Sequence, residues 1–217
     1  MPPAAPFDLP RIDREKPLLI VDVDEVLGLF MHGFGAFVAQ RGYELRLERF
    51  ALFQNLYRPG ALEHLDLDTG RELFNEFFRH GSEEMLPTPD AVDSLTALSP
   101  HASIVILTNA PDHAREPRAR WLARHGMDYP LLINSGPKGS MVAALAALTA
   151  GPSAFVDDLI PNLDSAAEAA PAVSRFQLVA DPRLAPLAPS APERHPRIDD
   201  WPTLRLALAE ALGVKVR

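Results

Sequence analysis

The sequence predicts an α/β protein whose core is a parallel β-sheet with helices on both faces. Three apolar runs, at residues 18–21, 104–107 and 154–156, have the length and continuous hydrophobicity of strands that are buried on both sides. Segments with helical character lie between and after them, at residues 117–125 and in the Ala-rich stretch after residue 138. The 217 residues suffice for one sizeable core and a small accessory unit.

The first apolar run ends in two acids one residue apart, Asp22 and Asp24. Carboxylates at the end of a buried strand are costly, because like charges in a medium of low dielectric oppose each other's ionisation. A bound cation would neutralise them, and the carboxyl end of such a strand is where open α/β sheets bind ligands. The pair therefore indicates a metal-assisted active site. On this pair alone, the alternative is a strand that runs into an acidic turn.

Polar residues also follow the other two apolar runs. Thr108 and Asn109 follow the second run, and the acid pair Asp157-Asp158 follows the third. Lys138 lies in a short loop just before the Ala-rich helical stretch. Because the carboxyl ends of parallel strands meet at one edge of a sheet, we expect these side chains to lie close to the first acid pair.

In order and type these motifs resemble those of the haloacid dehalogenase superfamily of phosphatases and phosphotransferases. The matching segments, in chain order, are the Asp-x-Asp motif at residues 22–27, the Thr/Ser motif at Thr108-Asn109, the lysine motif at Lys138 and the acidic motif at Asp157-Asp158. The resemblance covers about residues 17–180, and four motifs in order are far more specific than any one. Many members carry Gly after the second Asp, whereas this chain has Glu25. The resemblance therefore does not predict the conformation of the turn at this position.

The resemblance implies a three-layer, Rossmann-like core formed by residues 1–28 and 88–217, with a small helical cap of the C1 type at residues 29–87. Within this insert aromatic residues recur at helical spacing, and eight of the eleven phenylalanines lie between Phe30 and Phe78. We expect most of them to form the insert's own core. The first dozen residues are expected to form an irregular arm.

The resemblance also implies a chemistry for the motifs. Asp22 would be the nucleophile that forms an aspartyl-phosphate, and Asp24 the general acid and base. Thr108, Asn109 and Lys138 would bind the phosphoryl group.

A Mg²⁺ ion is the cofactor that the resemblance implies. Its ligands would be the carboxylates of Asp22 and Asp158 and the backbone carbonyl of Asp24, with Asp157 binding a metal-bound water or orienting the site. The sequence does not rank the adjacent acids Asp157 and Asp158, so these two roles could be exchanged.

The predicted function is therefore Mg²⁺-dependent hydrolysis of a small phosphorylated metabolite. A 5′-nucleotidase-like enzyme acting on nucleoside monophosphates, and a catalytically silent module that binds a phospho-ligand or a protein, are the alternatives. The net charge of −8 argues against a nucleic-acid polymer as partner. No apolar stretch reaches membrane-spanning length, and the absence of cysteine fits a cytoplasmic location. The sequence leaves the substrate and the oligomeric state open.

Three further expectations concern single residues. Arg118 should be solvated on the helix at residues 117–125. Asn162 should either hold the loop after the acidic motif or cap the helix at residues 162–170, and we prefer the cap. Thr108 and Lys138 should lie at loop edges, so that their replacement lowers turnover with little effect on folding.

Overall fold

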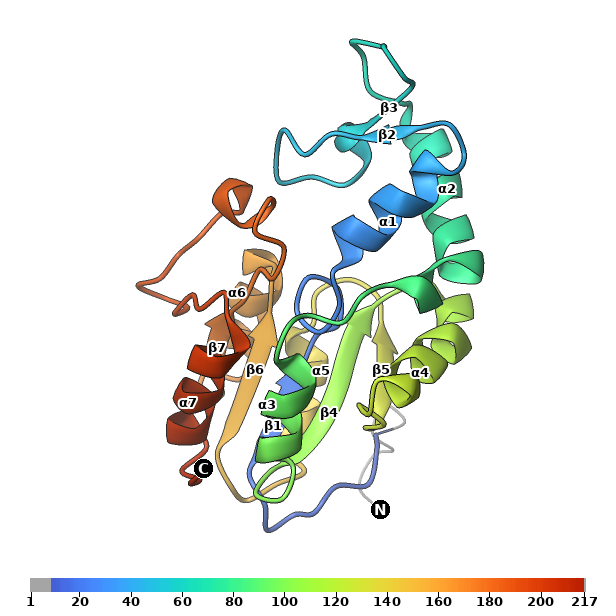
Figure 1. Ribbon diagram of the computed structural model, residues 1–217. Coiled ribbons are helices and arrows are strands. Elements are labelled where there is room, and N and C mark those ends of the chain that lie inside the picture. Colours follow the sequence, from blue (N-terminus) through green and yellow to red (C-terminus); the bar gives the residue numbers. More distant parts are fainter. Residues whose placement is uncertain (1–8, 217) are drawn as a thin grey trace.

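A five-stranded parallel sheet forms the centre of the computed structural model, which describes residues 9–216 (Figure 1). The strand order is β5-β4-β1-β6-β7. The strands are β1 Leu18–Val21, β4 Ser103–Asn109, β5 Leu131–Asn134, β6 Ser153–Asp157 and β7 Ser174–Gln177. The three predicted strands are the central ones, and their apolar side chains are buried. The predicted α/β class with a parallel sheet is confirmed.

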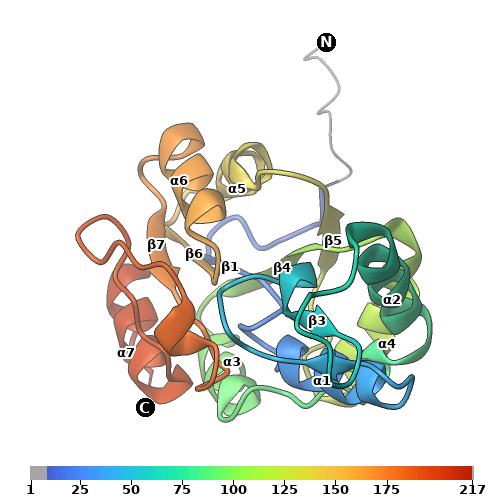
Figure 2. The ribbon, with the colours of Figure 1, turned by 90° about the horizontal axis from the view of Figure 1, so that it is seen from above.

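Helices cover both faces of the sheet, which gives the expected three layers (Figure 2). One face carries α3 Ala91–Leu98, α4 Arg115–Arg124 and α7 Trp201–Ala211, and the other carries α5 Gly139–Ala146 and α6 Ile160–Ala169. Side chains alternate along β1, so Leu19 and Val21 pack with the first group of helices and Leu18 and Ile20 with the second. Short 3₁₀ turns lie at η3 Asp112–Ala114 and η4 Ala185–Leu187.

The insert at residues 29–87 lies beyond the end of the sheet toward which the strands point (Figure 1). Its elements are α1 Phe30–Ala39, β2 Glu44–Leu45, η1 Phe53–Asn55, β3 Leu56–Tyr57, α2 Leu67–His80 and η2 Ser82–Glu84. The sequence predicts only helices here, whereas β2 and β3 form an antiparallel pair. Strands of two residues are too short for a hydrophobic period to reveal them.

The phenylalanines of the insert form an aromatic cluster between α1 and α2. The ring centroid of Phe30 lies 5.5 Å from that of Phe34 and 5.4 Å from that of Phe77. Phe34, Phe77 and Phe78 are completely buried. Aromatic pairs at these separations add to the stabilisation from burial. The expectation that most of these residues form the insert's own core is confirmed.

The apolar runs do not predict the edge strands β5 and β7. β7 reads Ser-Arg-Phe-Gln, which has too few apolar residues to stand out, and the four residues of β5 are only half-buried. The expected N-terminal arm falls mostly on residues 1–8, which lie outside the described residues.

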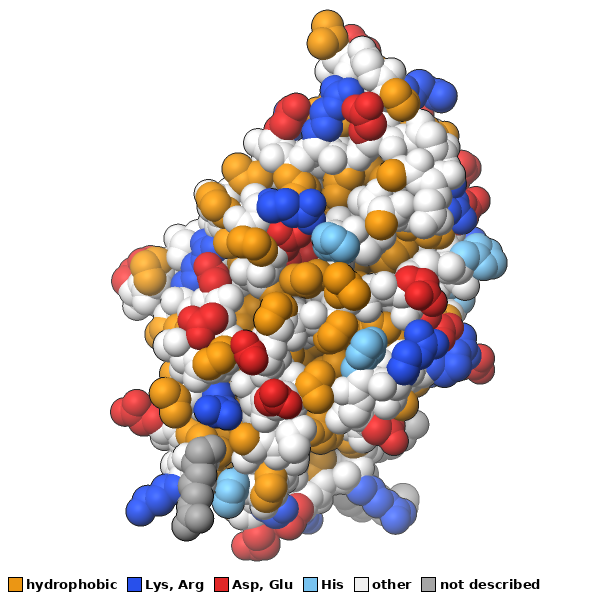
Figure 3. Space-filling view, in the orientation of Figure 1, with side chains coloured by type: hydrophobic (Ala, Val, Ile, Leu, Met, Phe, Trp, Pro, Cys, Tyr) orange, Lys and Arg blue, Asp and Glu red, His pale blue; other side chains and the backbone are white. Residues whose placement is uncertain are grey.

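Within residues 9–216, no helix combines the length and apolar character that a bilayer crossing needs. Acidic and basic side chains are intermingled on the face shown in Figure 3. The charge of this face is therefore mixed rather than collected into a field of one sign.

Candidate active site

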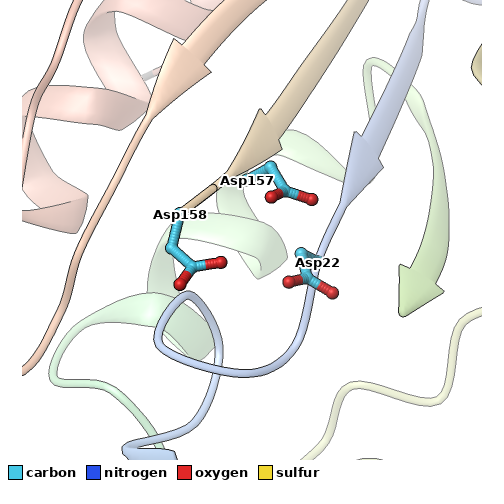
Figure 4. A group of neighbouring side chains, drawn as sticks. All are labelled: Asp22, Asp157 and Asp158. Atoms are coloured by element: carbon cyan, nitrogen blue, oxygen red, sulfur yellow. The ribbon is translucent and has the colours of Figure 1, made fainter. Parts of the chain in front are cut away.

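The carboxylates of Asp22, Asp157 and Asp158 converge at the carboxyl end of the sheet (Figure 4). β1 and β6 are parallel neighbours, and the backbone N–H of Asp22 donates to the carbonyl of Val156 over 3.0 Å. This pairing places the acid at one strand end beside the acid pair at the next. One oxygen of each carboxylate lies within 4.8 Å of the others. The structure thus brings these three predicted residues together.

Lys138 lies between two of these carboxylates. Its Nζ atom is 2.7 Å from Oδ1 of Asp22 and 2.7 Å from Oδ2 of Asp157, and its side chain is fully buried. Burial alone would lower the pKa of Lys138, but the two carboxylates outweigh burial and hold this pKa above its usual value. Lys138 therefore stays charged. Lys138 does lie at the end of a loop, directly before α5, as expected. Its side chain is nevertheless buried in two ion pairs, which argues against the expectation that its replacement has little effect on folding.

Both oxygens of Asp157 are engaged by protein donors. Oδ2 accepts from Lys138, whereas Oδ1 accepts from the backbone N–H of Leu159 at 2.9 Å and from the side-chain amide of Asn162 at 3.0 Å. Burial raises the pKa of Asp157 to about 6, although Lys138 opposes the rise. Asn162 lies inside α6, which begins at Ile160, so it does not cap this helix as expected. It holds Asp157 instead.

The carboxylate of Asp158 has fewer hydrogen-bond donors around it than that of Asp157. Among the described residues only its backbone carbonyl accepts a hydrogen bond, from the side chain of Gln177 at 2.9 Å. Burial and the nearby charges of Asp157 and Asp22 raise the pKa of Asp158 well above its ordinary value. Three carboxylates thus face one ammonium group, and a divalent cation would neutralise the excess negative charge. All-oxygen donors of this kind fit a hard cation such as Mg²⁺.

Asp24 is paired with a cation that the sequence does not single out. Nη2 of Arg118 lies 2.7 Å and 2.9 Å from the two carboxylate oxygens, and the Arg118 side chain is fully buried. The expectation that Arg118 is solvated is therefore wrong. Arg118 lies three and four residues before the buried Trp121 and Leu122, so it shares the inner face of α4 with them. This spacing could have indicated its burial from the sequence. The ring of Phe78 lies 5.1 Å from the guanidinium carbon.

The turn after Asp24 depends on Glu25. Its φ of 60° lies in the left-handed region, where glycine is favoured and other residues are strained. Two hydrogen bonds compensate, because Oε1 accepts from the backbone N–H of Met31 at 2.7 Å and Oε2 from that of Asp181 at 3.1 Å. Burial raises the pKa of Glu25 to about 7. Glu25 thereby connects the first turn of α1 in the insert to the core loop after β7.

Thr108 and Asn109 end strand β4, next to β1 in the sheet. The hydroxyl of Thr108 is fully buried and has no hydrogen-bond partner among the described residues. An unpaired buried hydroxyl is unfavourable, and a ligand oxygen would satisfy it. The side-chain amide of Asn109 donates to the carbonyl of Gly136 at 3.0 Å and accepts from Asn134 at 2.7 Å. Asn109 thus ties the end of β4 to the loop that carries Lys138.

The carboxylate cluster opens into a cavity of about 620 Å³ between the core and the insert. A volume of this size accommodates a small organic ligand. The polar residues that line the cavity are Asp22, Asp24, Glu25, Asn109, Lys138, Asp158 and Asn162. They come from the strand ends of the core, from the loop before α5 and from the first turn of α6. The predicted site residues therefore share one cavity, except for Thr108 and Asp157, which lie buried beside it.

The sequence matches no protein-family model and no curated protein. Among solved structures, a haloacid dehalogenase-like protein of unknown function from Agrobacterium tumefaciens is similar with a TM-score of 0.60 and 18% identity, over 89% of this chain and 97% of that one. A haloacid dehalogenase-like family protein from Streptococcus pneumoniae gives 0.58 and 14%, over 90% and 98%. The Bacillus subtilis protein YfnB, in a magnesium-bound crystal form, gives 0.59 and 14%, over 90% and 99%. The chain therefore has the fold shared by haloacid dehalogenase-like hydrolases.

Proposed function

We propose that the protein is a Mg²⁺-dependent phosphatase that hydrolyses a small phosphorylated metabolite through an aspartyl-phosphate. The observation that carries this proposal is the placement of Asp22. Its carboxylate lies against the ammonium group of Lys138, beside the unsatisfied carboxylate of Asp158, and at a cavity large enough for a substrate. A nucleophilic carboxylate flanked by a cation and by a metal site is suited to a phosphoryl group, which carries negative charge.

The reaction would have two steps. In the first, an oxygen of Asp22 attacks phosphorus, the bond between phosphorus and the ester oxygen breaks, and Asp24 donates a proton to the departing oxygen. In the second, Asp24 removes a proton from water as that water attacks the same phosphorus. Inorganic phosphate leaves, and the Asp22 carboxylate is restored. Lys138 stabilises phosphoryl charge in both steps, and the buried Thr108 hydroxyl would donate to a phosphoryl oxygen.

The residues that would hold Mg²⁺ are Asp22, Asp158 and the backbone carbonyl of Asp24. When bound, the ion supplies neutralisation of charge between the attacking carboxylate and the phosphoryl oxygens. Asp158 is assigned to direct binding because none of the described residues donates to its carboxylate, whereas both oxygens of Asp157 are engaged. Asp157 then orients Lys138 and the surrounding loop.

Magnesium should stabilise the protein strongly at neutral pH and weakly at low pH. In the folded, metal-free protein the pKa of Asp158, the assigned ligand, is raised well above the ordinary value of 3.8, and that of Asp157 is raised to about 6, so both take up protons between pH 3.8 and about 6. The folded state therefore binds more protons in this window, so the stability of the metal-free protein falls as pH rises through it. Mg²⁺ competes with these protons. At about 100 times its Kd it should add about 2.7 kcal/mol at pH 7.5, which raises Tm by about 5–10 °C, and far less at pH 5.

Thermal unfolding with MgCl₂ and with EDTA at both pH values measures this effect. Asp158→Asn should abolish the shift, while Asp93→Asn, on the exposed surface of α3, should retain it. A Tm that does not respond to Mg²⁺ at pH 7.5 would remove the metal from the proposal.

Release of inorganic phosphate from acetyl phosphate, with Mg²⁺ and with EDTA, tests the activity itself. Turnover in Mg²⁺ that chelation abolishes is expected. Mg²⁺-dependent binding of inorganic phosphate without any turnover would instead favour the silent phospho-ligand-binding module.

Arg118 is proposed to position Asp24 for proton transfer. Arg118→Met keeps the length of the side chain and removes the charge that orients the carboxylate, so turnover should fall by about 10-fold or more for alkyl phosphates, whose leaving groups need a proton. Acetyl phosphate has a better leaving group, so its single-turnover release of acetate, which precedes the step that needs the base, should be affected less. Arg120→Met, at a solvent-exposed neighbour on α4, is the control. An equal loss on both substrates would mean that Arg118 serves only the fold.

A further inference from the structure

We infer that the substrate is a monophosphate ester whose organic group is apolar, such as an aryl or branched alkyl group. This inference rests on the proposed phosphatase function and specifies its substrate class. It follows from the residues that line the cavity away from the carboxylates.

The walls of the cavity are apolar on both sides. The insert contributes Phe30, Met31, Phe50, Leu52 and Phe74, and the core side includes Leu159, Ile160 and Leu184. Every polar lining residue among those described belongs to the core, where it ends or follows a strand, precedes α5 or lies in the first turn of α6. A bound ester would therefore place its phosphoryl group at a polar base and its organic group between apolar walls.

The insert contains many charged side chains, yet those described lie outside the cavity lining. Arg41 pairs with Glu76 at 3.2 Å, and Arg46 pairs with Glu44 and lies over the ring of Tyr57. Arg49 is half exposed and pairs with Glu48. The apolar wall is therefore a property of this face of the insert and not of its overall composition.

Polar or multiply charged organic groups would bind weakly in this cavity. A sugar hydroxyl placed against Leu52 or Phe74 would lose its hydrogen bonds to water and gain none. A second phosphate would need a second cation, and Lys138 is the only cation among the described lining residues, already shared by two carboxylates. The acidic base would repel such a group. An apolar group, in contrast, gains from leaving water.

The aromatic part of the wall is held rigidly. Phe30 packs on Phe34 and Phe77, and Phe74 packs edge-on against Phe78 with ring centroids 4.8 Å apart. A wall fixed by such contacts does not have to be ordered when the substrate binds, which favours affinity for a flat apolar group.

The test compares esters that share a phosphoryl group and differ in the organic group. With Mg²⁺ and the wild-type protein, kcat/KM for 2-naphthylmethyl phosphate, whose leaving group is an alkyl alcohol as in the two polar esters, should exceed that for glucose 6-phosphate and uridine monophosphate by about 10²-fold or more. Equal values, or a preference for the polar esters, would overturn the inference while leaving the phosphatase intact.

Two substitutions in the cavity wall test whether these apolar side chains cause the preference for an apolar organic group. Leu52→Asn and Leu159→Asn should each raise KM for 2-naphthyl phosphate by about 10-fold and change KM for acetyl phosphate several-fold less, because acetyl phosphate has a far smaller apolar group to bury against the wall. Leu62→Asn makes the same change at a leucine of the insert that is 95% exposed, and should change neither. Wild-type kinetics in both wall variants would contradict the inference.

A binding measurement separates this inference from the proposed function. 2-Naphthylmethylphosphonate, which cannot be hydrolysed, should bind the Mg²⁺-loaded wild-type protein about 10²-fold more tightly than methylphosphonate. Tight selective binding without turnover of any ester would refute the phosphatase and support the apolar site. Equal affinity for the two phosphonates would refute the apolar site whether or not esters are hydrolysed.

Discussion

Asp22→Asn is expected to abolish phosphate-ester hydrolysis while the protein stays folded. The amide cannot attack phosphorus, so the rate should fall by about 10⁴-fold or more, as for the loss of other enzymatic nucleophiles. Asn has nearly the shape of Asp, and its introduction removes one of three clustered like charges. Without metal the variant should therefore unfold at the same temperature as the wild type, or at a higher one. Steady-state phosphate release and thermal unfolding measure the two effects.

Asp93→Asn serves as the matched control, because Asp93 is an exposed acid on α3, away from the cavity. It should retain wild-type turnover. An Asp22→Asn variant that keeps a tenth or more of the wild-type rate would exclude Asp22 as the nucleophile.

Lys138→Ala should damage both stability and activity. The substitution leaves Asp22 and Asp157 buried without their cation, and removal of one partner from a buried ion pair typically costs about 3–5 kcal/mol. The pKa of Asp157, already raised to about 6, would rise further, so the loss should be larger at pH 8 than at pH 5, where this carboxylate can take up a proton. Turnover should fall by about 10²-fold or more.

Urea unfolding in EDTA at the two pH values measures the loss of stability. Lys215→Ala removes an exposed lysine near the C-terminus and should change the unfolding free energy by less than about 0.5 kcal/mol. Equal stability of Lys138→Ala and wild type at pH 8 would show that the two ion pairs do not form.

The centre of the fold could be predicted from the sequence because its strands are short, apolar and buried on both faces. Residues 18–21, 104–107 and 154–156 carry that signal, and the polar residues after them mark the sheet edge. The edge strand β7 contains Arg175 and Gln177 and lacks a continuous apolar run. Its place in the sheet comes from pairing with β6, a contact across the chain that local pattern does not encode.

Arg118, Glu25 and Asn162 have partners at the site that the sequence analysis did not predict. The local sequence predicts that Arg118 is solvated. In the fold α4 packs against the core, and Arg118 is buried in an ion pair with Asp24. Glu25 occupies a glycine-like turn because two distant backbone N–H groups satisfy its side chain. Asn162 sits one turn too late to cap α6 and reaches Asp157 instead. The folded structure, and not the local sequence, supplies these partners.

The aspartyl-phosphate on Asp22 is the central claim, and Asp24→Asn should make it visible. This variant keeps the nucleophile, and acetyl phosphate has a leaving group that needs little protonation, so phosphate should still transfer to Asp22. Hydrolysis would then stall without the base, and the intermediate should accumulate. Intact-mass and peptide mass spectrometry after incubation with acetyl phosphate and Mg²⁺ should find one added phosphoryl group, located on Asp22 and absent from the Asp22→Asn variant. A phosphoryl group on another residue, or none in an Asp24→Asn protein that binds Mg²⁺, would contradict the proposed mechanism.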